Sequence, residues 1–329
     1  MAKKILIYNS GGGIGDSIQL LSLINTLKSE LKNTKFYYLS AHNNHFNSTL
    51  KDFNCQIQTL DLKIKYFGFR WWHFFNLNKK IKESNIDYFD IIIDLQSKLR
   101  NTLILKMIPH KSFISASFNF KLSKPQMNIK KNKKISITIL EAINFILDKK
   151  YLIKEYNIEN IDKKFFIEAE RLLPKDNYIG FSITQGNVYR KKEWPLERVI
   201  KISEEFVKKN KIPVFLIEKK YSDLKNKIKN SIPSALFPEH ESYLNSPALV
   251  TCLGKRLDLA ITIDNGIMHM LSLSKVPTIS LFGPTDSEKF APNYENSLVL
   301  DSKRLYNSKD VSSITVEDVL KAAKQFVNF

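Results

Sequence analysis

The part of this 329-residue chain that most constrains its fold is the segment Asp264–Asp286, DNGIMHMLSLSKVPTISLFGPTD. The apolar run before it, 259–263, predicts a buried strand, and Asp264-Asn265-Gly266 predicts a turn that opens a short amphipathic helix. Val276-Pro277 ends that helix, and 278–282 predicts a second strand. Such a turn directs backbone N–H groups and the positive end of the helix at one place. The segment therefore predicts an anion site, with His269 one turn into the helix.

Strands and helices alternate along the whole chain. Short apolar runs predict strands at 4–8, 36–39, 90–94, 178–183 and 213–217, and helical spacing predicts helices at 17–31, 135–147, from Pro195 and over 313–329. This alternation is typical of parallel sheets with helices on both faces. We therefore expect an α/β chain of two Rossmann-like domains that face each other across a cleft, in residues 1–160 and 170–312. The helix at 313–329 is a candidate to pack back on the first domain.

The composition excludes several classes of protein. A hydrophobic content of 43% favours a globular chain over a disordered one. No apolar stretch reaches the ~20 residues of a spanning helix, and the N-terminal run at 5–8 is shorter than the about 7–15 residues of a signal peptide. Cys55 and Cys252 lie far apart in the sequence and suggest no disulfide framework. We therefore expect a cytoplasmic protein.

The net charge of +18 is open to two readings. It can attract an acidic partner, such as nucleic acid, anionic lipid or a phosphorylated substrate. It can equally reflect scattered surface lysines in a chain rich in Lys, Asn and Ile. One denser cluster predicts an exposed basic loop in the N-terminal half: Lys121, Lys124, Lys130, Lys131, Lys133 and Lys134.

A glycine loop, Ser10–Asp16, joins the first predicted strand to the first helix. It does not match a dinucleotide-binding fingerprint, because Asp16 stands where the third glycine belongs and no acid ends the second strand. It does not match a P-loop, because the chain has no Gly-Lys-Ser/Thr triplet here. The carboxylate of Asp16 can cap the helix or project from the loop as a base, and both readings stay open.

The stretch 65–75, KYFGFRWWHFF, interleaves aromatic and basic residues. Burial in the core explains a part of it. An aromatic cluster beside Arg70 also suits a membrane interface, where Trp and Tyr are enriched. We weigh burial and peripheral contact with the inner membrane equally.

Four motifs, in this order along the chain, resemble glycosyltransferase family 9, the heptosyltransferases of lipopolysaccharide assembly. They are Gly15-Asp16, Asp94-Leu95-Gln96 followed by Arg100, Lys192-x-Trp194-Pro195, and Asp264-x-Gly266-x-x-His269 with Phe282-Gly283-Pro284-Thr285-Asp286. The resemblance implies a GT-B fold and an inverting, metal-independent transfer from an ADP-heptose-type donor. It departs from the family at Leu20-Leu21-Ser22-Leu23, where members often have a proline, and at Glu218, where a glycine is usual.

The resemblance also implies roles for single residues. Asp16 would be the general base, and Lys192 would neutralise the donor diphosphate. The other donor-binding residues would be Thr184, Gln185, Asp264, Asn265, Gly266 and His269, and the acceptor-binding residues Gly15, Lys98 and Arg100. We expect no metal and no cofactor, because Lys192 and the helix end supply the positive charge that a leaving diphosphate needs.

The function expected is transfer of a heptose-type sugar from a nucleotide-diphosphate donor to a lipopolysaccharide core or another cell-envelope glycan. The expected partners are this donor and an anionic glycolipid or glycan, with no nucleic acid, and the expected state is a monomer. Two alternatives stay open. One is transfer of a different sugar to a surface polysaccharide, and the other is a non-catalytic basic protein that binds anionic surfaces or nucleic acid.

Overall fold

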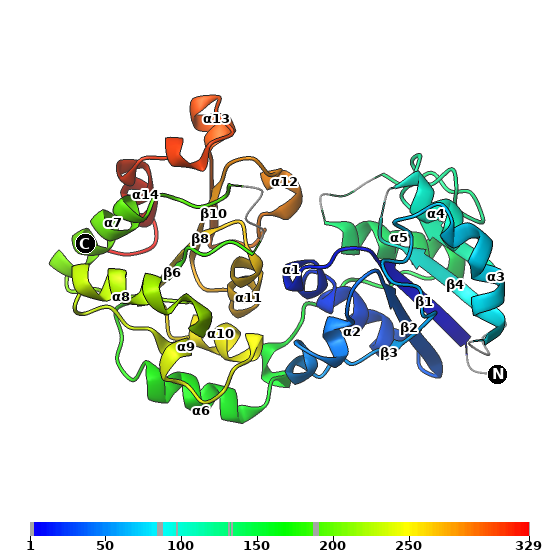
Figure 1. Cartoon of the computed structure of the whole chain (residues 1–329), viewed down its shortest axis with the longest axis horizontal. Coiled ribbons are helices and arrows are strands. Elements are labelled where there is room, and N and C mark those ends of the chain that lie inside the picture. Colours follow the sequence, from blue (N-terminus) through cyan, green and yellow to red (C-terminus); the bar gives the residue numbers. More distant parts are fainter. Residues whose placement is uncertain are drawn as a thin grey trace. The chain divides into compact units, whose positions relative to one another are not determined.

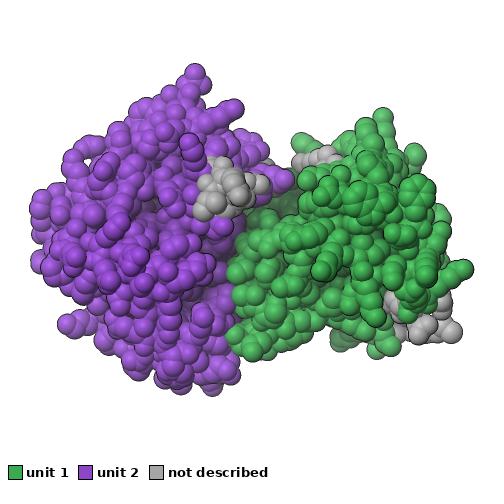
Figure 2. All heavy atoms as spheres, viewed as in Figure 1, with its two compact units in different colours: residues 1–156 green, residues 157–329 purple. Residues whose placement is uncertain are grey.

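The chain consists of two compact units, Met1–Tyr156 (unit 1) and Asn157–Phe329 (unit 2), as Figure 2 shows. The computed structural model describes residues 3–83, 88–96, 98–130, 132, 134–186 and 191–328. Lys131 and Lys133 of the predicted basic loop, and the middle of the loop before Lys192, lie outside the described residues. Each unit is a five-stranded parallel sheet with helices on both faces, which confirms the predicted α/β class.

The sheet of unit 1 has the strand order β3-β2-β1-β4-β5 (Figure 1). Its central strands are buried on both faces, which is why their sequences are continuous apolar runs. The edge strands are short or polar, and the sequence did not predict them. The strands are β1 (Lys3–Asn9), β2 (Thr34–Ser40), β3 (Gln58–Thr59), β4 (Phe89–Asp94) and β5 (His110–Ser115).

Helices cover the sheet of unit 1 from both sides. One core cluster joins the sheet to α3 and α4 through apolar residues that include Leu77 and Ile104, and α2 and α5 pack against each other. The predicted helix 17–31 is interrupted, because Leu20 N donates to Ser17 O in a tighter turn. The helices are α1 (Ile14–Ile18), α2 (Leu21–Glu30), α3 (His73–Glu83), α4 (Leu99–Leu105) and α5 (Ile135–Leu147).

The sheet of unit 2 has the order β10-β9-β8-β6-β7. Its strands are β6 (Tyr178–Ser182), β7 (Ile212–Phe215), β8 (Leu259–Ile263), β9 (Thr278–Phe282) and β10 (Ser297–Asp301). One core cluster joins this sheet to α7, α8 and α14, and α10 packs against α6 and α11. The helices are α6 (Lys163–Leu172), α7 (Leu196–Lys208), α8 (Ser222–Ser231), α9 (Pro238–Glu241), α10 (Pro247–Gly254), α11 (Gly266–Ser274), α12 (Ser287–Phe290), α13 (Ser302–Tyr306) and α14 (Val316–Ala323).

The last helix, α14, packs on elements of unit 2. Its apolar side, with Val316 and Val319, lies in the same core cluster as Trp194, and α14 contacts α7, β9 and β10. The Trp194 indole is buried and its Nε1 donates to Ile314 O at 2.9 Å. The hydrophobic residues of the helix are therefore already covered by its own unit.

Each sheet has one point at which the strand order reverses. In unit 1 this switch point lies between β1 and β4, and in unit 2 between β6 and β8. In open parallel sheets, ligands bind at the carboxyl ends of the strands that flank such a point. The two switch points therefore mark where each unit is expected to hold a ligand.

None of the helices within the described ranges is long and apolar enough to cross a bilayer.

Candidate functional site

The switch point of unit 2 carries the predicted donor-binding residues. Thr184 and Gln185 follow β6, and Asp264, Asn265 and Gly266 follow β8 directly. β6 and β8 pair in parallel, with Ser182 opposite Thr262, so the two loops leave the sheet side by side. Parallel pairing thus brings together residues that lie 80 positions apart in the sequence.

Lys192 joins these two loops through its backbone and its side chain. Its backbone N–H donates to Gln185 Oε1 at 2.7 Å. Its ammonium forms an ion pair with Asp264 Oδ2 and donates to the Asp264 carbonyl at 3.2 Å. The side chains of Lys192 and Asp264 are 14% and 9% exposed, so the pair is shielded from most of the solvent.

Asn265 fixes the start of α11. Its Oδ1 accepts from Met268 N at 2.9 Å, which makes it the N-cap of the helix. Its Nδ2 donates to Ser182 Oγ at 2.7 Å and to Thr184 O at 2.9 Å. One side chain therefore caps the helix and ties it to the end of β6.

His269 lies in the first turns of α11 and is 7% exposed. Burial lowers the pKa of His269 to about 4, while Asp264 raises it and Lys192 lowers it by smaller amounts. The imidazole is therefore neutral at neutral pH and has one N–H donor and one acceptor nitrogen. The imidazole lies close enough to the ion pair for the charges of Asp264 and Lys192 to affect its pKa.

Together these groups make up the candidate anion site, at the place where the sequence predicts one. The positive end of α11 and the Lys192 ammonium lie at the carboxyl ends of two central strands. In the unliganded protein Asp264 balances the charge of Lys192. A phosphate oxygen that enters beside this pair would meet a cation, a helix N-terminus and a neutral imidazole.

The switch point of unit 1 carries Asp16 and an amide bridge that the sequence did not reveal. Gln96, which follows β4, donates from Nε2 to Asn9 Oδ1 at 3.0 Å at the end of β1. Asn9 Oδ1 also accepts from Gly11 N at 2.9 Å and so holds the start of the glycine loop. The bridge crosses the switch point, as Asn265 does in unit 2.

The carboxylate of Asp16 lies over the glycine loop. A Cβ on Gly11 would lie 2.7 Å from Asp16 Oδ2, and one on Gly13 would lie 3.3 Å from it. Glycine at these two positions therefore leaves room for the carboxylate. Asp16 belongs to the first turn of the five-residue helix α1, just after Gly15, and neither reading of its role is decided by this position.

Behind this loop, the buried carboxyl of Asp94 holds the chain that leaves β4. Its two oxygens accept from Thr102 Oγ1 at 2.7 Å, from Ser115 Oγ at 2.9 Å and from Gln96 N at 2.9 Å. Burial raises the pKa of Asp94 to about 6, and these hydrogen bonds act in the opposite direction. Asp94 thereby fixes the backbone from which Gln96 reaches Asn9.

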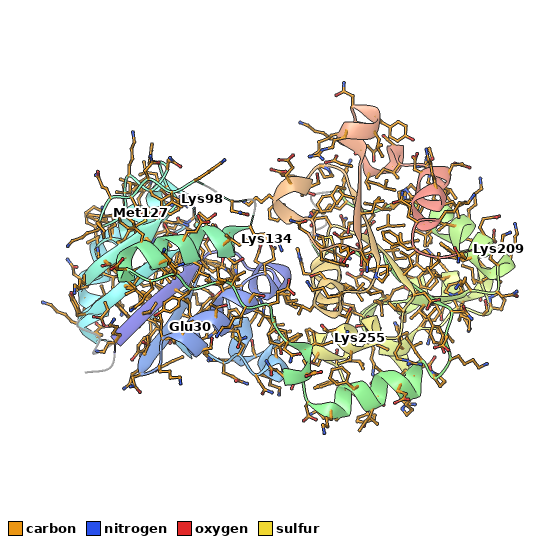
Figure 3. The ribbon with its side chains drawn as sticks, turned by 180° about the vertical axis from the view of Figure 1, so that it is seen from behind. Glu30, Lys98, Met127, Lys134, Lys209 and Lys255 are labelled. Atoms are coloured by element: carbon orange, nitrogen blue, oxygen red, sulfur yellow. The ribbon has the colours of Figure 1, made fainter. Side chains whose placement is uncertain are left out.

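The two predicted acceptor cations, Lys98 and Arg100, lie at the start of α4 (Figure 3 labels Lys98). Arg100 Nε donates to the Gly68 carbonyl at 2.8 Å, and the Lys98 ammonium lies 5.7 Å from the Phe69 ring centre. Both cations therefore border the aromatic segment 65–75. Tyr66 and Phe69 of that segment pack around the His42 ring, which a Cβ on Gly12 would touch.

The structure thus places the predicted residues in two groups, one at the switch point of each unit. Unit 1 holds Asp16, Gly15, Lys98 and Arg100, and unit 2 holds the donor-binding residues. Sequence reasoning gave no role to Asn9, to His42 or to Gln96 of the second motif, because the contacts of these residues depend on strand order. Within the described ranges no group of three or more His, Cys, Asp or Glu side chains is arranged to hold a metal ion.

Comparisons with known proteins identify the family of the chain. The sequence profile of glycosyltransferase family 9 (heptosyltransferase) matches residues 74–320. Lipopolysaccharide heptosyltransferase 1 of Campylobacter coli is 23% identical over 266 residues, which cover 74% of this chain and 78% of that protein.

Two solved structures share the fold over nearly the whole chain. The family 9 glycosyl transferase of Veillonella parvula has a TM-score of 0.69 and 20% identity, and the match covers 99% of this chain and 97% of that one. The Escherichia coli heptosyltransferase WaaC with ADP has a TM-score of 0.68 and 13% identity, over 98% of this chain and 97% of that one. The GT-B fold class is thereby confirmed. Because the family profile covers most of its length, this chain is a glycosyltransferase that belongs to glycosyltransferase family 9.

Proposed function

We propose that the enzyme transfers a heptose-type sugar from an ADP-heptose-like donor to a lipopolysaccharide core or another cell-envelope glycan, at the cytoplasmic face of the membrane. The observation that carries this proposal is the pairing of Lys192 with Asp264 at the N-terminus of α11. The N-terminus of α11 and the Lys192 ammonium, which Asp264 balances in the unliganded protein, are the positive groups that a leaving nucleoside diphosphate would meet. The names of the relatives support the sugar and the acceptor: a lipopolysaccharide heptosyltransferase, and a heptosyltransferase solved with ADP.

In the proposed reaction Asp16 accepts the proton of the acceptor hydroxyl as its oxygen forms a bond to the anomeric carbon. The bond from that carbon to the diphosphate oxygen breaks with both electrons going to the diphosphate. A single displacement from the opposite face inverts the anomeric centre. Lys192 and the first turn of α11 stabilise the charge that develops on the leaving diphosphate, so the step needs no divalent ion.

The test separates the roles of the two groups. We expect calorimetric titration to give the same ADP affinity for wild type and Asp16→Asn, while transfer by Asp16→Asn falls by at least 100-fold. Lys192→Ala should weaken ADP binding by about tenfold or more, because a charge-assisted contact is worth about 1.5–3 kcal/mol. Lys208→Ala, which removes an exposed lysine paired with Glu205, is the matched control and should bind normally.

Two outcomes would overturn parts of the proposal. Near-normal turnover by Asp16→Asn would show that Asp16 is not the general base. Loss of transfer on adding EDTA would show that the reaction requires a metal ion. Membership of the family decides against the non-catalytic alternative. The remaining alternative is transfer of a different sugar to a surface polysaccharide. A panel of nucleotide sugars in a thermal-shift assay tests it, since the true donor stabilises the folded state most.

A further inference from the structure

Four large aromatic side chains stand exposed on unit 1 next to the acceptor cations. Trp71, Trp72, Phe74 and Phe75 are 56%, 58%, 40% and 81% exposed, and we call them the aromatic face. They fill four of the five positions 71–75, which run into α3, and α3 lies beside α4 (Figure 1). Soluble proteins seldom leave so much contiguous apolar surface without a partner.

The aromatic face belongs to a firmly held segment. Phe67 is buried and stacks on His73, with ring planes 13° apart. Tyr8 OH donates to Phe67 O at 2.9 Å, and Gly68 N donates to His73 Nδ1 at 3.1 Å. Leu77 and Ile81 bury the other side of α3 in the core. The fold therefore fixes the segment on one side and presents the four rings on the other.

Charge indicates what covers this face. No Asp or Glu occurs between Asp61 and Glu83, whereas six cations do: Lys63, Lys65, Arg70, Lys79, Lys80 and Lys82. Unit 1 as a whole has 25 Lys and Arg against 11 Asp and Glu, a net +14 of the chain's +18. The cores of protein interfaces are depleted in lysine, but lysines around exposed Trp and Phe are typical of segments that lie on anionic bilayers.

We propose that the aromatic face docks unit 1 on an anionic phospholipid bilayer. The rings enter the boundary between headgroups and acyl chains, and the surrounding lysines pair with lipid phosphates. α3 is an 11-residue helix, so it lies along the surface. The inference deepens the proposed function, because Lys98 and Arg100 contact the same segment and would meet an acceptor that is anchored in that bilayer.

Vesicle co-sedimentation tests the docking directly. Wild type should sediment with vesicles of phosphatidylglycerol and phosphatidylethanolamine and much less with pure phosphatidylcholine. Trp71→Ala with Trp72→Ala should lower the partition coefficient at least tenfold, and Lys79→Gln with Lys80→Gln should lower it severalfold at low salt. Matched controls are Phe145→Ala on α5 and Tyr243→Ala in unit 2, which remove rings that are 57% and 78% exposed.

Tryptophan fluorescence gives a second readout. The chain has three tryptophans, and Trp194 is buried at 3% exposure, so a blue shift on adding anionic vesicles reports on Trp71 and Trp72. Unchanged sedimentation of the double tryptophan variant would overturn the proposal. So would a concentration-dependent dimer that this variant abolishes, because a second copy of the chain would then be the occupant.

The test also separates this proposal from the proposed function. With a lipid-free acceptor the double tryptophan variant should keep the transfer rate of wild type. If wild type shows no transfer but still binds vesicles through Trp71 and Trp72, the docking stands and the proposed activity fails. If transfer is normal and vesicle binding is absent, the docking fails alone.

Discussion

At the scale of single residues, the buried imidazole of His269 in the candidate donor site makes the stability of the folded state depend on pH. Its pKa of about 4 lies below the ordinary 6.5, so the unfolded chain takes up a proton first as the pH falls. The folded state is therefore favoured above pH 6.5 and loses that advantage as the pH falls from about 6.5 to about 4. His269 contributes this dependence because the fold keeps it neutral.

This predicts a specific change in the pH profile of unfolding. As the pH falls from 7 to 5, protonation of His269 in the unfolded chain should lower the free energy of unfolding of wild type by about 2 kcal/mol. The free energy of unfolding of His269→Gln should fall less over the same interval, because glutamine is not protonated. Urea titrations of both proteins at pH 7, 6 and 5 measure the difference, and parallel profiles would show that His269 is not held neutral.

The resemblance of the motifs to family 9 implies most residues of the candidate site. It names Lys192, Asp264 and Asn265, and the structure brings these three together. The amide bridge of Gln96 with Asn9 was not predictable in the same way. Neither residue stands in a motif with its partner, and their contact depends on β4 pairing with β1 rather than with β3.

At the scale of elements, the turn before α3 depends on one glycine. Gly68 has a φ of +83°, and a Cβ there would lie 2.5 Å from Tyr8 OH and 3.1 Å from Asn101 Cγ. Gly68 also donates to His73 and accepts from Arg100. The turn thus joins β1, α3 and α4 at a position that only glycine fits without strain.

Gly68→Ala should therefore destabilise unit 1 by about 2 kcal/mol or more, because left-handed strain and a steric overlap act together. The variant should also raise the KM for acceptor, since the carbonyl that orients Arg100 moves. Gly186→Ala is the control, because a Cβ there meets nothing within 4 Å. Chemical denaturation that gives equal midpoints for the two variants would contradict this account.

The elements that the sequence predicted are those with a strong period or a continuous apolar run. α5 has the predicted bounds, and β8, α11 and β9 form the predicted unit. β5 was missed because HKSFIS contains too few apolar residues to indicate a strand, yet it pairs with β4 along its length. Tertiary pairing stabilises such an edge strand where local propensity does not.

At the scale of the whole molecule, positive charge is divided unequally between the units. Unit 1 holds a net +14 and unit 2 the remaining +4. Long-range attraction is screened over about 10 Å at 0.1 M salt, whereas a contact inside a largely buried pair is screened much less. The two substrates should therefore respond differently to salt.

Raising NaCl from 0.05 to 0.5 M should increase the KM for an anionic acceptor severalfold. The dissociation constant of ADP should change less, because Lys192 is only 14% exposed and acts at short range. Steady-state kinetics and calorimetry over the same salt series compare the two. A larger effect on ADP than on the acceptor would show that the charge of unit 1 does not serve the acceptor.

Strand order is also a property of the whole molecule, and this is why the sequence predicted two Rossmann-like halves but not their switch points. Along the chain β1 is followed by β2 and β6 by β7. The pairs β1–β4 and β6–β8 form only after the chain has crossed over to the other side of the first strand. Those crossovers decide which loops become neighbours. A single sequence contains no local signal for them.

The unequal charge has a further consequence for how the protein meets a negatively charged surface. The electrostatic pull falls mainly on one unit, so free tumbling becomes biased before any contact is made. Collisions that present unit 1 first occur more often than random orientation would allow. Fewer orientations therefore have to be sampled before unit 1 meets the surface.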